Sequence, residues 1–302
     1  MSASAALFRL LVFPGALFAV PMSWLMVWLH RKVNARLQGR VGPPFYQPYY
    51  DFVKLLAKQP VSRPTLQRVV MYGLPLLAVA STLGALALLP VIPGSSGFTG
   101  DLVLLVALLE FAPLCSVLAG YASRSLYGQI GSTREAVLGV VYSLPFMIAL
   151  FALSSAAGTL SVAGVATVPS WMVKAPALAA LALCLPAKLR LNPFSVPNAE
   201  QEIYAGSLTE FDGPSLALWE LAHDLEWVAL VGLWVAIALP LPGAPVIVQA
   251  VVFVLVLLAI VPALSLVASG TARLKLSQAA RVFWQWGLGI STITLVIAAV
   301  WQ

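Results

Sequence analysis

Charged residues are scarce in this chain. Only 9% of its 302 residues are Asp, Glu, Lys or Arg, whereas 61% are hydrophobic. Ordinary soluble domains carry about 25% charged residues, and so few charges would leave large apolar patches exposed on a water-soluble globule. The composition therefore excludes a soluble enzyme and a disordered chain. It predicts an all-α, polytopic membrane protein.

Cysteine and histidine are equally rare. Cys115 and Cys184 both lie in apolar segments, and His30 and His223 are the only histidines. This spacing offers neither a disulfide framework nor a set of metal ligands. We therefore expect no metal site, no catalytic residue and no redox cofactor in this chain. The net charge of +6 is not gathered on a soluble domain, so it favours membrane orientation over nucleic-acid binding.

Apolar segments recur along the whole sequence. A helix that crosses the hydrocarbon core needs about 20 residues. Eight segments approach this length: 7–29, 70–92, 101–121, 136–157, 171–187, 214–239, 246–268 and 283–301. We therefore predict one integral membrane domain over residues 1–302, with about eight transmembrane helices.

The connecting segments fall into two sets. Residues 93–100, 158–170 and 240–245 contain no charge, whereas the other connections carry most of it: 30–69, 122–135, 188–213 and 269–282. The positive-inside rule assigns the charged set to the cytoplasm, including the two long loops at about 30–69 and 188–213. An even number of spans then places both termini on the non-cytoplasmic side.

The charges concentrate in two segments of opposite sign. Residues 30–68 hold eight basic residues and one acid, whereas residues 188–226 hold two basic residues and seven acids. The two segments lie on the same predicted side of the membrane. We interpret the pair as a docking surface and a place of proton entry.

The first of these segments has a defined path. Gly and Pro between residues 39 and 48 favour a non-helical route, and apolar residues at a spacing of three to four from Pro48 to Ala57 predict a short amphipathic helix on the membrane surface. The alternative is a basic loop that is held only by anionic lipid.

The acidic segment leads into a helix. Asp212-Gly-Pro214 indicates a helix start. Glu220 and Asp224 then lie four residues apart, and His223 and Glu226 three apart, so that carboxylates occupy two adjacent faces. Ionisable residues within a span are functional candidates that face the bundle interior. The alternative is that Glu226 stays solvated at the membrane interface.

Glu110 lies in the middle of a span, with no counter-charge on its own helix. A charge at this depth costs about 2.5–3.5 kcal/mol on the insertion scale, which favours a protonated or buried relay group over a lipid-facing one. The alternative is a neutral packing acid. Glu135 follows Arg134 at the expected start of the next span, where the pair could serve only to cap it.

Two segments resemble the signatures of one family. Residues 39–55 read Gly-Arg-Val-Gly-Pro-Pro-Phe-Tyr-Gln-Pro-Tyr-Tyr-Asp-Phe-Val-Lys-Leu, and residues 198–213 read Asn-Ala-Glu-Gln-Glu-Ile-Tyr-Ala-Gly-Ser-Leu-Thr-Glu-Phe-Asp-Gly. Both are similar to the subunit 1 family of respiratory complex I, and the eight spans match over essentially the whole chain. The Gly-Pro-Pro motif and the Arg-Glu-Ala at 134 resemble most the branch found in group 4 energy-converting [NiFe] hydrogenases and formate hydrogenlyases.

The resemblance implies a subunit that joins a peripheral electron-transfer arm to antiporter-like membrane subunits. Residues that match the basic loop beneath the arm are Arg36, Arg40, Gln47, Asp51 and Lys54. Together with the residue-level reasoning, it predicts a proton path along Glu110, Glu135, Glu200, Glu202, Glu210, Asp212, Glu220, Asp224 and Glu226.

Two positions depart from the family. Asn198 stands where members often have an acid, and Ser143 lies where the complex I branch has a glutamate in the fourth span. These departures favour a hydrogenase-type or weakly pumping member over a quinone-reducing complex I.

We therefore predict a membrane-anchor and proton-path subunit of a complex I-like [NiFe] hydrogenase or formate hydrogenlyase in a prokaryotic cytoplasmic (inner) membrane. Its expected partners are a [NiFe] hydrogenase-like large subunit, an iron–sulfur small subunit and antiporter-like membrane subunits. The [NiFe] centre and the iron–sulfur clusters are expected in those partners. The alternatives are the quinone-chamber subunit of NADH:quinone oxidoreductase and a stand-alone ion transporter.

Overall fold

The computed structural model describes residues 3–61, 64–91, 100–123, 125–197, 200–241 and 243–301. Within these ranges it is all-helical, which confirms the predicted fold class. Eight helical segments are long and apolar enough to cross a membrane: Leu7–Leu37, Gln67–Ala87, Asp101–Ala122, Leu126–Ala157, Trp171–Lys188, Gly213–Ala238, Val246–Gly270 and Leu276–Val300. Asn198 lies outside the described residues.

The first span differs from its expected limits of 7–29. It consists of α1 (Ala3–Leu11) and α2 (Ala16–Leu37), separated at Pro14 and Gly15. A Cβ atom at Gly15 would lie 2.1 Å from the carbonyl oxygen of Leu10, so only glycine fits this break. Lys and Arg are good helix formers, and α2 therefore continues through the basic residues after position 29 to Leu37.

The predicted amphipathic helix is α3 (Gln47–Ala57). It packs against α2 and α10. The rings of Tyr49 and Phe52 each lie 5.6 Å from that of Trp24 on α2, in edge-to-face and tilted arrangements that stabilise aromatic pairs. The backbone N–H of Val61 donates to Asp212 Oδ2 over 2.7 Å. Tertiary contacts of the protein itself thus fix this segment.

The next three long helices are α4 (Thr65–Ala87), α5 (Asp101–Ala122) and α6 (Leu126–Ala157). Helix α6 begins ten residues before the expected limit of 136, so the predicted loop 122–135 is mostly helix. The interpretation of Glu135 as a capping residue at a helix start is therefore wrong, because Glu135 lies in the third turn of α6.

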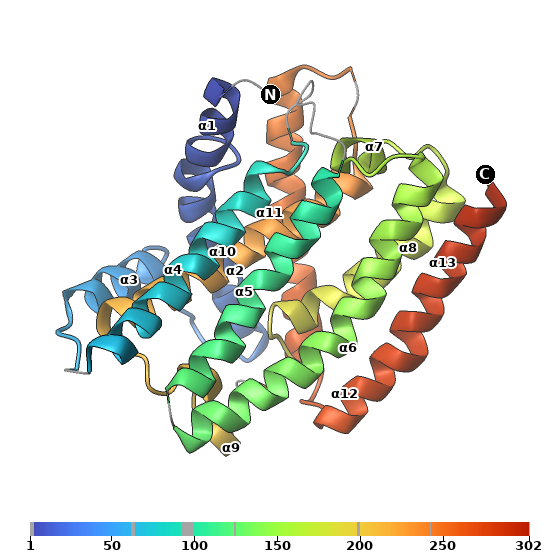
Figure 1. Ribbon diagram of the computed structural model, residues 1–302. Coiled ribbons are helices and arrows are strands. Elements are labelled where there is room, and N and C mark those ends of the chain that lie inside the picture. The colour runs from blue at the N-terminus through green and yellow to red at the C-terminus, as the bar shows by residue number, and fades with distance from the viewer. Residues whose placement is uncertain are drawn as a thin grey trace.

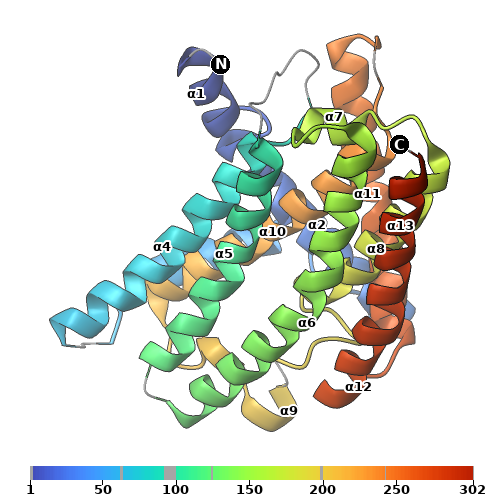
Figure 2. The same cartoon turned by 45° about the vertical axis from the view of Figure 1, so that its right-hand side comes forward.

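The second half of the chain contains α7 (Val162–Ala166), α8 (Trp171–Lys188), the short α9 (Glu200–Ile203) and η1 (Gly206–Leu208), α10 (Gly213–Ala238) and α11 (Val246–Gly270). The last span combines α12 (Leu276–Val282), the π-helical η2 (Phe283–Gly287) and α13 (Leu288–Trp301). Helices α1, α7 and the end of α13 lie at one end of the bundle, and α9 and α12 lie at the other (Figures 1 and 2). The cytoplasmic assignment of the second end stays a prediction.

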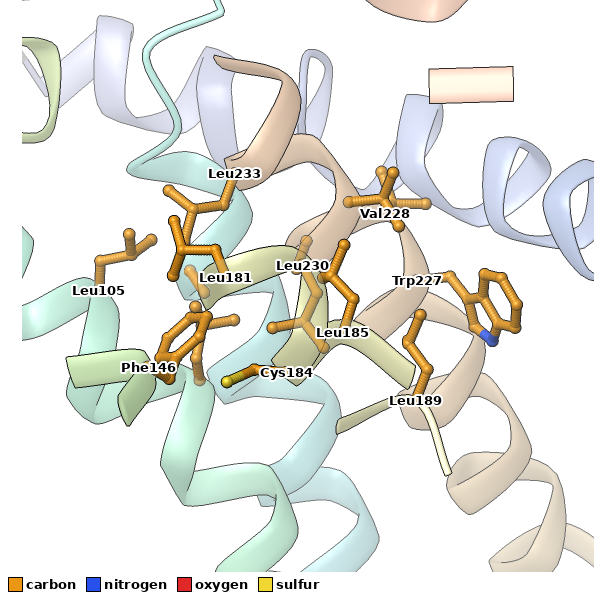
Figure 3. Packing of buried hydrophobic residues seen from close by; sticks show 14 of the residues in the cluster. Leu105, Phe146, Leu181, Cys184, Leu185, Leu189, Trp227, Val228, Leu230 and Leu233 are labelled. Atoms are coloured by element: carbon orange, nitrogen blue, oxygen red, sulfur yellow. The ribbon is translucent and has the colours of Figure 1, made fainter. Parts of the chain in front are cut away.

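Helix α10 is the central element. It contacts α2, α3, α4, α5, α8 and α11, and 83% of its apolar stretch is buried, against 28% for α11 and for the last span. Apolar side chains of α10 meet those of α8 and α6 in one cluster, which includes Phe146, Leu181, Leu185 and Leu230 (Figure 3). Polar residues in the middle of α10 are therefore enclosed by protein.

Helix α6 approaches the acidic loop closely at Gly131. A Cβ atom there would lie 2.6 Å from both Gly206 Cα and the backbone nitrogen of Ser207 in η1, whereas a Cβ atom at Gly139 of the same helix would meet only Tyr142 Oη at 3.9 Å. The absence of a side chain at Gly131 thus sets the distance between α6 and this loop.

We expect Gly131→Ala to destabilise the protein by about 1–3 kcal/mol, because backbone atoms must move to accommodate the methyl group. Gly139→Ala is the matched control and should be neutral or stabilising by up to ~1 kcal/mol, since alanine favours the helix. The measurement is the thermal unfolding midpoint of each purified variant. Equal midpoints for the two variants would contradict the proposed contact.

Candidate functional site

The carboxylate of Glu110 on α5 has partners from two other helices. Lys188 Nζ, at the end of α8, lies 2.5 Å from Glu110 Oε1, and Ser143 Oγ on α6 donates to Oε2 over 2.7 Å. The side chain of Lys188 is 2% exposed. The fold thus supplies the counter-charge that Glu110 lacks on its own helix, which makes a charge within the span tolerable.

Aromatic rings surround the same lysine. Its ammonium lies 5.0 Å from the ring centre of Tyr142 and 4.5 Å from that of Phe146, both on α6. Cation–π attraction of this kind favours the charged amine in a desolvated place. Lys188 is therefore bound by one carboxylate and two ring faces.

A second buried ion pair lies nearby. Arg190 Nε donates to Glu135 Oε1 on α6 over 3.2 Å, and the two side chains are 8% and 5% exposed. Burial alone would lower the pKa of Arg190, but the carboxylates of Glu135 and Glu226 raise it above its ordinary value. Arg190 is consequently a permanent positive charge beside these carboxylates.

The backbone at Arg190 is unusual for a residue with a side chain. Its φ is +54°, in the left-handed region. The backbone N–H of Arg190 donates to Ala187 O and that of Leu191 to Pro186 O, which is a helix ending where glycine is the common residue. Arginine at this position costs on the order of 1–2 kcal/mol, which the ion pair with Glu135 offsets.

Helix α10 contributes a further carboxylate to this region. Glu226 is 5% exposed, and its Oε2 lies 3.2 Å from His223 Nδ1. The alternative of a solvated interfacial residue is therefore wrong, because α10 is enclosed by its neighbours. Glu226 and Lys188 also line one internal cavity of about 10 Å³, close to the smallest volume that holds a single water molecule.

The other acidic face of α10 points toward α3. Glu220, Asp224 and Asp51 line a groove of about 250 Å³ together with basic residues that include Arg31 and Lys54. Arg31 Nη1 lies 3.2 Å from Asp51 Oδ2, and Gln47 Nε2 donates to Asp51 Oδ1 over 2.8 Å. The α10 acids thus lie in two different surroundings. Glu226 is buried beside His223, whereas Glu220, which is exposed, and Asp224, which is 8% exposed, line the groove at α3.

The remaining predicted residues are more superficial. Glu202 pairs with Arg134 over 2.6 Å and is 56% exposed. Glu210 is exposed, and Asp212 is the N-terminal residue that precedes α10. Of Glu200, only its place in α9 is described. Arg36, Arg40 and Lys54 lie toward the surface as expected for docking residues.

Reasoning from the sequence missed several members of the buried network. From the sequence alone, Ser143 is only a position where a glutamate is missing. Lys188 and Arg190 are only charges of a loop. Their position directly after an apolar span was the available signal, but the carboxylates that they bind lie 78 and 55 residues away. Among the described residues, no three His, Cys, Asp or Glu side chains form a group that could hold a metal ion.

Eight helices of membrane-spanning length enclose ion pairs between charged side chains. These features define a class of multi-pass membrane proteins with charged residues inside the helical bundle. A family model described as NADH dehydrogenase matches residues 10–299. The chain belongs to this family, as a member of its subunit 1 branch.

Known proteins support the same placement. The chain is 30% identical to hydrogenase-4 component C of Escherichia coli (strain K12), covering 74% of this chain and 73% of that protein. It is 28% identical to formate hydrogenlyase subunit 4 of the same organism, covering 93% and 94%. It is 32% identical to the H subunit of the NADH-quinone oxidoreductase of Thermomicrobium roseum (strain ATCC 27502 / DSM 5159 / P-2), covering 68% and 69%.

A solved structure has the same fold over nearly its full length. It is a chain of the membrane-bound sulfane sulfur reductase, an archaeal respiratory membrane complex. The TM-score is 0.87 at 25% identity, and the match covers 98% of this chain and 99% of that one.

The Lys188–Glu110 pair predicts a characteristic mutational pattern. Lys188→Met should destabilise the protein by about 3 kcal/mol, because it leaves a carboxylate without its cation. The double variant Lys188→Met/Glu110→Gln should recover most of that loss. Arg134→Gln, which breaks the exposed pair with Glu202, should cost less than ~1 kcal/mol. Unfolding midpoints of these variants and of Glu110→Gln give the test, and strictly additive losses at Lys188 and Glu110 would contradict it.

Proposed function

We propose that this chain is the membrane-anchor and proton-path subunit of a complex I-like, membrane-bound [NiFe] hydrogenase or formate hydrogenlyase. The observation that carries the proposal is the network of Glu110, Glu135, Glu226 and the two buried cations at the end of α8, in which Glu135 and Glu226 are buried and Glu110 is 21% exposed. Packing alone has no need for ion pairs at this depth, and buried ionisable residues in spans typically serve proton or ion movement. The likeness to hydrogenase-4 component C and formate hydrogenlyase subunit 4 favours the hydrogenase branch.

In this proposal the carboxylates of Glu110, Glu135 and Glu226 have different roles. Glu110 and Glu226 border Lys188 from different helices, so a proton that neutralises one of them strengthens the attraction of Lys188 to the other. Arg190 stays charged and pairs with Glu135. A proton can thus change the electrostatic balance of the network without leaving a buried charge unpaired.

The acidic segment connects this network with the surface. It starts with Lys188 and Arg190, within the network, and contains Glu202 in α9 and Asp212 before α10. A partner that moves the segment therefore acts on Arg190 and on the start of α10 through the chain itself. In the proposal, events in the peripheral arm shift proton affinity in the membrane by this route.

The redox centres belong to partners in this proposal. The [NiFe] centre lies in a hydrogenase-like large subunit and the iron–sulfur clusters in a small subunit, both above the basic loop that includes Arg36, Arg40 and Lys54. Antiporter-like subunits lie beside the bundle. The complex resides in a prokaryotic cytoplasmic membrane.

A second function has one specific observation in its favour. The groove of about 250 Å³ between α2, α3 and α10, with the likeness to the H subunit of an NADH-quinone oxidoreductase, fits the quinone-chamber subunit of a complex I. Ser143 stands where the complex I branch has a glutamate, and this difference favours the hydrogenase branch. In this chain Ser143 donates a hydrogen bond to Glu110.

Copurification distinguishes these two functions. Membranes that contain an affinity-tagged copy of the chain should yield a [NiFe] large subunit and an iron–sulfur subunit, with hydrogen-evolving activity in the same fraction. Quinone-dependent NADH oxidation without nickel would instead establish the complex I function. Recovery of the chain alone, with ion transport after reconstitution, would establish a transporter.

Proton movement tests the role of the buried network. Glu110→Gln and Glu226→Gln should each lower proton translocation per electron in inverted vesicles at least about tenfold, since an amide cannot exchange the proton. Asp101→Asn is the matched control at the opposite end of the bundle: the amide oxygen can still accept from Val162 N–H, which Asp101 Oδ1 does over 2.7 Å. Unchanged coupling in Glu110→Gln would identify this residue as a neutral packing acid.

A further inference from the structure

A wide cleft of about 830 Å³ opens at the end of the bundle where α9 lies and α12 begins (Figure 1). Its walls come from α6, the segment after α8, and the connection between α11 and α12. Three cationic side chains line it, those of Arg134, Arg273 and Lys275, against the single carboxylate of Glu202. None of these cations belongs to the buried network.

The positive charge of the cleft is only partly compensated. Glu202 pairs with Arg134 over 2.6 Å. Neither Arg273 nor Lys275 forms an ion pair with a carboxylate in the described part of the chain. Two cations thus remain for an anion from outside the chain.

The cationic wall is held in place by the fold. Arg273 Nε donates to Ser195 Oγ over 3.1 Å, and the backbone N–H of Leu274 donates to Pro193 O over 2.9 Å. The backbone N–H of Lys275 donates to the side-chain oxygen of Gln278 over 3.0 Å. These contacts do not involve the terminal guanidinium nitrogens of Arg273. The planar fork that these nitrogens form matches the oxygens of a phosphate.

Exposed aromatic side chains lie on the helix that begins at the cleft. Leu276 lines the cleft and begins α12, and further along the same span Trp284 and Trp286 are 57% and 66% exposed. Tryptophan is enriched at the level of lipid headgroups. Ile293 on α13 is 58% exposed, so that apolar surface extends along the helix.

We propose that this cleft binds the phosphate of an anionic phospholipid, with Arg273 and Lys275 on its oxygens and the acyl chains along α12 and α13. Charge and apolar surface are adjacent here, and a phospholipid uses both. Free phosphate would use only the cations, and an acidic protein segment would leave the exposed tryptophans without a contact. The cleft lies at the end that carries the charged loops, where basic residues attract anionic lipid headgroups.

The test uses the complete purified complex in nanodiscs or detergent, with binding of phosphatidylglycerol measured by titration and native mass spectrometry. Arg273→Gln/Lys275→Gln should weaken binding roughly thirtyfold, at about a fivefold loss per cation. Arg281→Gln removes a neighbouring exposed cation of α12 that does not line the cleft, and should change the affinity no more than about threefold. Arg273→Lys should retain much of the binding.

Three results would overturn the proposal. The first is equal phosphatidylglycerol binding by the double variant and Arg281→Gln. The second is displacement of the lipid by millimolar inorganic phosphate, which would assign the cleft to a free anion. The third is loss of a partner subunit from the double variant with lipid binding unchanged, which would assign the cleft to a protein contact. Unaltered unfolding midpoints verify that the variants fold.

Discussion

The pairing of Lys188 with Glu110 is the interaction on which the interior of this protein depends. A carboxylate in the middle of a span requires a cation and a donor at hydrogen-bond distance, and these come from α8 and α6. Three helices must therefore meet at one depth. The aromatic faces of Tyr142 and Phe146 complete the enclosure. The charges can therefore pair only if α5, α6 and α8 pack together in this arrangement.

The central position of α10 separates two electrostatic environments. One face places Glu226 with His223 inside the bundle, and the other places Glu220 and Asp224 along the groove at α3. Of these carboxylates only Glu220 is exposed, whereas Asp224 and Glu226 are both buried. Acids within two turns of one helix thus lie in different surroundings.

Much of the fold could be predicted from the sequence, because span length and charge placement are local properties. The eight spans follow from the length of the apolar segments, and the amphipathic α3 and the two acidic faces of α10 follow from periodicity. The limits of the first and fourth spans could not, because basic residues near a membrane continue a helix as readily as they end it, and the helix extension at Gly131 depends on contact with η1. The ion-pair partners of Glu110 and Glu135 could not be predicted either, since ion pairs between residues distant in sequence follow from tertiary packing.

Arg190 gives the end of α8 a property of its own. Its left-handed backbone is a conformation that an arginine adopts only while its side chain is held, and the holder is Glu135 on another helix. The direction in which the chain leaves α8 is therefore linked to an ion pair with a different helix. The end of α8, the third turn of α6 and the start of the acidic segment are consequently positioned together, and none of the three can shift without disturbing the other two.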